Sequence, residues 1–366
     1  MNTNIILRLV GILLILIVMD GCLQPDPLNQ PFSTFQPVDI EDGLTLSDPA
    51  TENVEPDALR EIYHDMHDEY LYWQFRSMLV FRNGKLIAES YMKDDADRTK
   101  RHLIWSCTKQ FMGVLTGIAV SEGLIEEISD PVSKYMPESL SGHPDKAGIT
   151  IRNLLMMQSG IDYSNDGTTG QTDKVLRQIP DDITEFVLDR PVYTEPGKDF
   201  NYNDGDPQLM SAVIQTLAGI PTDEWADKVL FSKIELRNYS WVRYRDGVTL
   251  GGFGIETTPR EMAKLALCIA DEGRYKEDEV IETAWLEEMT SEQVEVDDDY
   301  SFGYYWWIDR NRDIRFMWGH GGQFAFIVPA KSLVVVMTSL PNTQGKHQIS
   351  GDQALEIVYR IMDVCI

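Results

Sequence analysis

Two strand-like regions enclose a long helical middle, and this order is what most constrains the fold of the 366-residue chain. Near the start, Asn83-Gly84 separates two apolar runs within residues 77–91. That pattern predicts a β-hairpin, because both residues of a tight hairpin turn must take positive φ. Near the end, four short segments rich in aromatic or β-branched residues are separated by turn residues: 302–308, 314–318, 323–328 and 332–337. Strands from both ends of the chain are therefore expected to share one sheet.

Apolar residues recur at three- and four-residue intervals over several other segments, as in amphipathic helices. These segments are 57–70, 103–123, 151–158, 182–188, 208–217, 223–229, 259–270 and 352–363. Thr150 and Thr258 stand where N-caps are expected. We therefore expect an α+β fold, with an antiparallel sheet flanked by N- and C-terminal helices and an inserted, mostly helical subdomain at about residues 110–235.

The first residues have the pattern of an export signal. Arg8 precedes an apolar run that is shorter than the roughly 20 residues of a membrane span. Residues 1–21 are therefore predicted to be a signal peptide, and Gly21-Cys22 resembles the site at which a bacterial lipoprotein is lipidated on its cysteine. Asp20 is unusual at its position, so a plain signal peptide or an uncleaved anchor helix remains open. Export to the periplasm or cell envelope is expected, and a lipid anchor on Cys22 is favoured over the other two possibilities.

Prolines punctuate residues 22–55 among polar and acidic residues, which predicts an extended tether ahead of a folded domain at residues 56–366. The formal net charge of −27 argues against nucleic acid as a partner. The cysteines at 107, 268 and 365 have apolar surroundings, and buried free thiols are favoured over disulfides. His64 and His67 have helical spacing without a third metal ligand, so an exposed helix face is favoured, and neither metal nor cofactor is expected.

The tetrapeptide Ser-x-x-Lys occurs twice, and the expected local structure separates the two copies. Ser90 and Lys93 lie at the end of a predicted strand, where residues three apart point to opposite faces. Ser106 and Lys109 lie at the start of a predicted helix, where residues three apart share one face. Apolar neighbours such as Trp105 disfavour the charged form of Lys109, and a helix N-terminus stabilises a developing oxyanion. A nucleophile with a lysine base is therefore predicted at Ser106, although a capping serine beside a surface lysine has the same spacing.

Several ordered blocks give this chain a resemblance to a known family. The blocks are 82–89, 106–109, 117–123, 130–137, 149–160, 196–202 and 319–322. Together they resemble the serine hydrolase family of class C β-lactamases, D-alanyl-D-alanine carboxypeptidases, related esterases and 6-aminohexanoate-dimer hydrolases. The resemblance implies a β-lactamase/transpeptidase-like fold, with Ser106 as nucleophile, Lys109 as general base and Tyr202 as general acid or base.

The family pattern changes at two places. Asp204 stands where the Tyr-x-Asn element has asparagine, although a shift of one residue would put Asn203 there. A carboxylate at this place would favour the ammonium form of Lys109 and so increase the share of Tyr202 in the base role.

His320-Gly321-Gly322 stands where penicillin-binding members have Lys-Thr-Gly, which helps to grip a substrate carboxylate. His320 is largely neutral at pH 7 and Gly321 has no hydroxyl, so anionic substrates are disfavoured. The resemblance also implies an oxyanion hole made by the backbone N–H groups of Ser106 and Gln323.

The combined expectation is acyl transfer from an ester or amide substrate to water, with Tyr202 or His320 helping to protonate the leaving group. Substrate contacts are expected at Asp204, Gly321, Gly322 and Trp105. Further aromatic residues could line an apolar pocket or belong to the core: Tyr304, Trp306, Trp307 and Trp318. A β-lactamase or D-alanyl-D-alanine carboxypeptidase is the alternative activity, and a non-catalytic binding protein on the same fold is the alternative of another class.

Overall fold

The computed structural model describes residues 29–163, 181–341 and 349–366. Its centre is an eight-stranded antiparallel sheet with the order β2-β1-β13-β12-β11-β10-β9-β8. The strands are β1 (Phe75–Arg82), β2 (Lys85–Tyr91), β8 (Val294–Glu295), β9 (Tyr300–Phe302), β10 (Trp307–Asp309), β11 (Ile314–Gly319), β12 (Gln323–Val328) and β13 (Leu333–Ser339). Because β1 pairs with β13, strands from the two ends of the chain lie side by side, as predicted.

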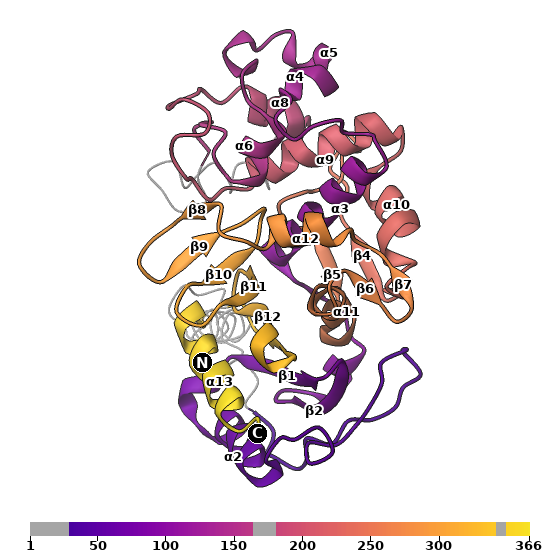
Figure 1. The fold of residues 1–366 in the computed structure, drawn as a ribbon, viewed down its shortest axis with the longest axis vertical. Helices are drawn as coiled ribbons and strands as arrows, with labels where there is room; N and C mark the ends of the chain where they lie inside the picture. The colour runs from indigo at the N-terminus through magenta and orange to yellow at the C-terminus, as the bar shows by residue number, and fades with distance from the viewer. Residues whose placement is uncertain (1–28, 164–180, 342–348) are drawn as a thin grey trace, which may run out of the picture.

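Helices lie on both faces of this sheet and also form a separate group (Figure 1). The longer helices are α2 (Pro56–Asp68), α3 (Thr108–Ser121), α9 (Gly205–Ala218), α11 (Pro259–Ala270), α12 (Thr283–Met289) and α13 (Gly351–Asp363). The shorter ones are α4 (Val132–Tyr135), α5 (Pro137–Leu140), α6 (Ile151–Leu155), α8 (Ile183–Leu188) and α10 (Thr222–Ala226). Helices α4, α5, α6, α8 and α9 gather at the top of Figure 1, away from the terminal helices α2 and α13. The predicted α+β class with an inserted helical part is confirmed.

Alternating side chains bury both faces of the central strands, since successive residues of a strand point in opposite directions. On β12, Phe324 and Phe326 belong to the core that includes residues of α2 and α13. Ala325 and Ile327 alternate with these residues and point to the opposite face. They belong to the second core, which includes residues of α11 and the helical group. Burial on both faces explains why these strands have nearly continuous apolar sequences.

Local sequence signals placed many boundaries correctly. Asn83 and Gly84 have φ of 53° and 75° and form the predicted hairpin turn. The side chains of Thr150 and Thr258 cap α6 and α11. The three cysteines of the described residues, at 107, 268 and 365, are buried and free, as predicted.

Residues 29–55, predicted to be part of an extended tether, instead pack on the domain. Phe35 and Val54 are each only 1% exposed, and the Phe35 ring stacks on Tyr63 of α2 at 5.4 Å between centroids. Arg260 of α11 also donates hydrogen bonds to the Asp42 carboxylate and to the Val38 carbonyl. Prolines give this segment little regular structure, but its apolar residues complete the core. The predicted signal peptide and Cys22 lie outside the described residues.

Two further predictions need correction. The predicted strand over 302–308 is two strands, β9 and β10, because the chain turns between them with Tyr305 at φ 66°. His67 was expected on an exposed helix face, but it is 6% exposed and its Nε2 lies 2.8 Å from Ser90 Oγ. Only His64 of that pair is exposed.

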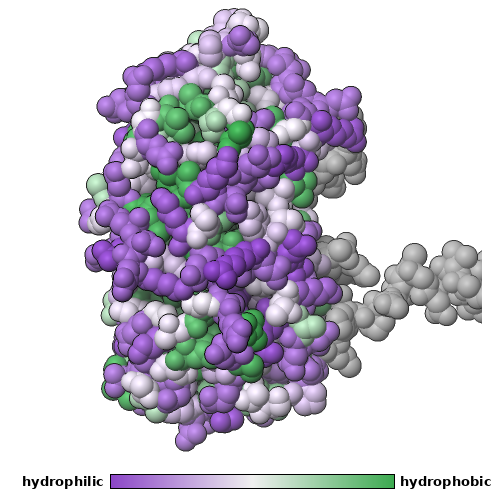
Figure 2. Space-filling model, turned by 90° about the vertical axis from the view of Figure 1, so that its right-hand side faces the viewer, coloured by the Kyte–Doolittle hydropathy of each residue, from purple (hydrophilic) through white to green (hydrophobic). Residues whose placement is uncertain are grey.

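Within the described residues, no helix is long and apolar enough to span a membrane. Figure 2 shows one face of the molecule, which is mainly hydrophilic with small, separate hydrophobic patches. Small patches of this kind are ordinary on folded domains.

Two smaller sheets accompany the central one in the described residues. A three-stranded sheet has the order β3 (His102–Leu103), β5 (Ile255–Thr257) and β4 (Tyr239–Trp241). A two-stranded ribbon consists of β6 (Arg274–Tyr275) and β7 (Asp278–Glu279). Strand β3 leads directly into the segment that contains Ser106.

Candidate active site

Ser106 lies in a 3-10 turn, Trp105–Cys107, that runs directly into α3. The α-helix itself begins at Thr108, later than the predicted residue 103. Trp105 has φ 52°, a conformation that bulky residues rarely adopt and that tends to occur at functional sites. The turn leaves Ser106 partly exposed, whereas Lys109 of α3 is completely buried.

The Lys109 amine is within hydrogen-bonding distance of three acceptors. Its Nζ lies 2.9 Å from Ser106 Oγ and 2.8 Å from the Gly252 carbonyl oxygen, and it also contacts Asp204 Oδ1. An ammonium group has three donors and no acceptor, so this arrangement satisfies it fully. The geometry therefore describes a charged Lys109 in the resting site.

Asn203 and Asp204, the two candidates for the asparagine position of the Tyr-x-Asn element, make different contacts. The Asn203 side chain accepts the Asp206 N–H at 2.7 Å and donates to the Asn201 carbonyl at 2.7 Å, so it organises the start of α9. Asp204, 2% exposed, is the residue that contacts Lys109. The site thus has a carboxylate where the family pattern has an amide.

Tyr202 lies over Lys109, whose Nζ is 4.9 Å from the ring centroid. Trp307 and Phe302 hold the ring from other sides, at centroid distances of 5.4 and 6.1 Å. Burial raises the pKa of Tyr202, an effect that the Lys109 charge and hydrogen bonds with Ser106 and Lys109 only partly offset. The phenol therefore keeps its proton near neutral pH, which suits a general acid.

The residues at 320–322 form the turn between β11 and β12. Gly321 and Gly322 have φ of 78° and 90°, and a Cβ on Gly321 would lie 2.7 Å from Pro341 Cα. The turn itself therefore requires glycine. His320 is exposed, and its ring meets the Trp105 ring edge-on at 5.0 Å between centroids, so it lies beside the nucleophile turn.

Gln323, the predicted second oxyanion donor, begins β12 next to the nucleophile turn. Its carbonyl accepts the Cys107 thiol at 3.3 Å, and its side chain donates to the Ser339 carbonyl at 2.9 Å. At the end of β11, a Cβ on Gly319 would lie 2.2 Å from the Ile104 carbonyl oxygen. The end of β11 therefore packs closely against the nucleophile turn. The contribution of the Gln323 N–H to an oxyanion hole remains a prediction.

The predicted aromatic pocket residues divide into two groups. Tyr304 and Trp306 are completely buried and belong to the core. Trp105, Trp307 and Trp318 are partly exposed and remain candidates for a substrate surface.

Gly252 is a site residue that the sequence analysis missed. Its carbonyl accepts from Lys109, and a Cβ there would lie 2.8 Å from Asp204 Cβ. The adjacent glycines Gly251-Gly252 were the available signal, because paired glycines often mark a close approach of two backbones. Here the approach is between this loop and the start of α9.

The family model described as Beta-lactamase matches residues 76–358. The 6-aminohexanoate-dimer hydrolase of Paenarthrobacter ureafaciens is 23% identical over 333 residues, covering 83% of this chain and 83% of the relative. A Bacillus anthracis structure provisionally named as a 6-aminohexanoate-dimer hydrolase has a TM-score of 0.69 at 19% identity, covering 93% of this chain and 89% of that one. The structure of EstCE1, described as a hydrolase with promiscuous acyltransferase activity, has a TM-score of 0.66 at 15% identity, covering 83% and 97%.

Proposed function

Because the chain belongs to the Beta-lactamase family, we propose that it hydrolyses an ester or amide bond through an acyl-enzyme on Ser106. The observation that carries this proposal is the partly exposed Ser106 hydroxyl 2.9 Å from the buried amine of Lys109. A nucleophile within hydrogen-bond reach of its base, which is itself oriented by a third group, is the usual arrangement for covalent catalysis. Asp204 is the orienting group here.

In the proposed acylation step, Lys109 releases a proton to Asp204 and accepts the proton of Ser106. The Ser106 oxygen then forms a bond to the substrate carbonyl carbon, and the backbone N–H groups of Ser106 and Gln323 stabilise the oxyanion. Tyr202 donates its proton to the departing alcohol or amine as the scissile bond breaks. Water then attacks the acyl carbon and gives a proton to the Lys109–Asp204 pair, which passes it to the Ser106 oxygen as the acyl–oxygen bond breaks.

The substrate is proposed to be a neutral ester or amide. The turn at 320–322 has no lysine or hydroxyl that could bind a substrate carboxylate. Lys109 is not available for this either, because it already forms an ion pair with Asp204. Partly exposed Trp105, Trp307 and Trp318 offer apolar surface. A relative named as a 6-aminohexanoate-dimer hydrolase and a structural neighbour described as a hydrolase with acyltransferase activity support acyl transfer as the reaction type.

The test is labelling with a fluorophosphonate probe, followed by peptide mapping. The probe should label Ser106, and Ser106→Ala should abolish the labelling. Ser90→Ala is the matched control, because it changes the other Ser-x-x-Lys sequence and should leave labelling unchanged. Unlabelled Ser106 in the folded wild-type protein would overturn the proposal.

Two other candidate functions lead to different results. A β-lactamase or D-alanyl-D-alanine carboxypeptidase would hydrolyse nitrocefin or D-alanyl peptides in preference to nitrophenyl esters. A second candidate is a non-catalytic binding protein on this fold. It is favoured by the contacts of Lys109 with Asp204 and the Gly252 carbonyl, because these contacts stabilise the ammonium form, which cannot act as a base. That protein would bind acyl compounds without turnover and would not react with the probe.

A further inference from the structure

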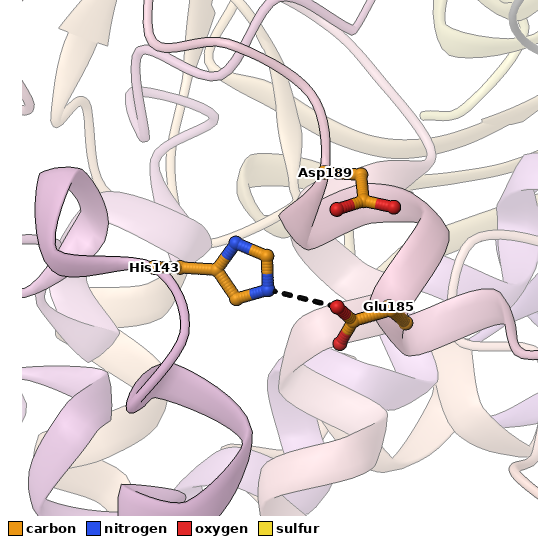
Figure 3. A group of neighbouring side chains, drawn as sticks. All are labelled: His143, Glu185 and Asp189. Atoms are coloured by element: carbon orange, nitrogen blue, oxygen red, sulfur yellow. Dashed lines mark hydrogen bonds and ion pairs between the residues drawn. The ribbon is translucent and has the colours of Figure 1, made fainter.

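Three side chains of the helical group make a cluster with the composition of a transition-metal site (Figure 3). His143 lies in the turn after α5, Glu185 lies on α8, and Asp189 is the residue after its last turn. One nitrogen or oxygen atom from each lies within 4.8 Å of the others. We propose that His143, Glu185 and Asp189 bind a divalent transition metal of the zinc class, with water completing the coordination.

The distances are close to those that a metal ion requires. Zinc binds histidine nitrogen and carboxylate oxygen at about 2.0–2.2 Å, so two ligand atoms in a tetrahedral site lie about 3.3 Å apart. His143 Nε2 and Glu185 Oε1 are 3.1 Å apart. Asp189 then has to move by only about 1.5 Å, which a change of its side-chain torsions supplies. In Figure 3 all three side chains point into the same space.

The charge of the cluster favours a cation. Glu185 and Asp189 are four residues apart on one helix face, where like charges destabilise the helix. Within residues 29–163, 181–341 and 349–366, Asp189 has no ion pair with a lysine or arginine. The neighbouring Arg190 lies over the Phe186 ring instead, 4.6 Å from its centroid. A bound dication would neutralise the two carboxylates.

The backbone at His143 is fixed by hydrogen bonds, and its side chain is mostly buried. The His143 N–H donates to the Leu140 carbonyl at 3.0 Å, and the His143 carbonyl accepts from the Lys146 N–H at 3.0 Å. The His143 side chain is 12% exposed, whereas that of Glu185 is 51% exposed. A preorganised nitrogen ligand with two accessible oxygen ligands favours zinc, cobalt or nickel over calcium or magnesium, which prefer oxygen-only sites.

A metal here would tie the turn at His143 to α8, and α8 packs on α9. The contact is close: a Cβ on Gly205, the first residue of α9, would lie 3.1 Å from Val187 Cγ1 of α8. Asp204 directly precedes α9, so the metal would stabilise the scaffold behind the catalytic groups without touching them. The site is thus structural, and it does not depend on the proposed hydrolase activity.

The test uses the folded protein after treatment with a chelator and dialysis. Titration calorimetry with zinc chloride should show one site per chain, and zinc should raise the thermal unfolding temperature. His143→Gln and Glu185→Gln should each weaken zinc binding by about 100-fold or more, because losing one of three ligands removes a large share of a metal site's free energy. Magnesium chloride should give neither binding heat nor stabilisation.

His64→Ala is the matched control. His64 and Asp68 form another exposed histidine–carboxylate pair on a helix, 3.4 Å apart, but without a third ligand. This variant should bind zinc as the wild type does. Any of three results would overturn the assignment: the wild type does not bind zinc, both cluster variants bind zinc as the wild type does, or His64→Ala loses zinc binding. Circular dichroism of the cluster variants separates lost binding from lost folding.

Discussion

Asp206 lies two residues beyond Asp204, in the first turn of α9, and is completely buried. Burial raises its pKa from 3.8 to about 7, against the hydrogen bonds from Ser159 and Asn203. Its Oδ1 atom has no hydrogen-bond partner within the described part of the chain. A buried carboxylate without full hydrogen bonding is costly, so the native state retains the proton.

The sign of the effect follows from proton linkage. The folded protein holds the Asp206 proton up to about pH 7, whereas the unfolded chain releases it near pH 4. The free energy of unfolding therefore falls as pH rises between these values. A shift of roughly three pKa units corresponds to about 4 kcal/mol, since each unit is worth about 1.4 kcal/mol. The loss is complete above pH 7.

Asp206→Asn removes this dependence, because asparagine resembles the protonated acid in shape and carries no charge. Relative to the wild type, the variant should gain about 3 kcal/mol of unfolding free energy between pH 4.5 and pH 8, since this range covers most of the interval between the two pKa values. Urea unfolding monitored by tryptophan fluorescence at several pH values measures the difference. The exposed Asp298→Asn is the control and should follow the wild-type profile. A difference between Asp206→Asn and wild type that stays constant across this range refutes the reasoning.

Four further changes have defined outcomes. Asp204→Asn removes the negative charge that favours the Lys109 ammonium, so the acid limb of the pH–activity profile should move to lower pH; an unmoved limb contradicts this role. Gly252→Ala puts a Cβ 2.8 Å from Asp204 Cβ and should lower kcat by at least about tenfold while the unfolding temperature changes little. Burial lowers the pKa of His67, so its contribution to stability is full above about pH 6.5 and declines as pH falls; His67→Gln should flatten that decline in urea unfolding. Arg260→Leu removes the two guanidinium hydrogen bonds to the buried Glu89 carboxylate and leaves it only the longer ion pair with Arg98 at 3.3 Å, so it should cost about 3 kcal/mol of unfolding free energy and expose residues 38–42 to limited proteolysis.

Features set by neighbouring residues were predictable from the sequence. The Asn83-Gly84 turn and the Thr150 and Thr258 caps depend on residues within one turn of the chain, and all three are present. Short runs of aromatic and β-branched residues between turn residues likewise identified most strands of the central sheet. The division of residues 302–308 was not visible, because an aromatic turn with Tyr305 at positive φ has the same composition as a strand.

Features set by distant contacts could not be predicted. Phe35 and Val54 look like isolated apolar residues of a proline-rich linker until α2 and the C-terminal segment provide their partners. His67 and Ser90 were assigned to unrelated motifs, yet the packing of α2 on the sheet brings them to 2.8 Å. The choice between Asn203 and Asp204 depends on where α9 begins, and that start is fixed by the Asn203 hydrogen bond to the Asp206 N–H.

The Lys109–Asp204 pair decides how protons can move in this site. A completely buried ammonium needs an opposite charge, and Asp204 provides it. The same ion pair keeps Lys109 protonated, so that Lys109 cannot act directly as a base. An asparagine would leave Lys109 free to become an amine, whereas the carboxylate must itself take a proton before Lys109 can accept one from Ser106. Tyr202 closes the cycle, because it gives its own proton to the leaving group and can be reprotonated by Lys109. In the proposed mechanism the Lys109–Asp204 pair thus passes the Ser106 proton on and returns to its starting charges. Turnover with a carboxylate at position 204 therefore requires that Lys109, Asp204 and Tyr202 act together.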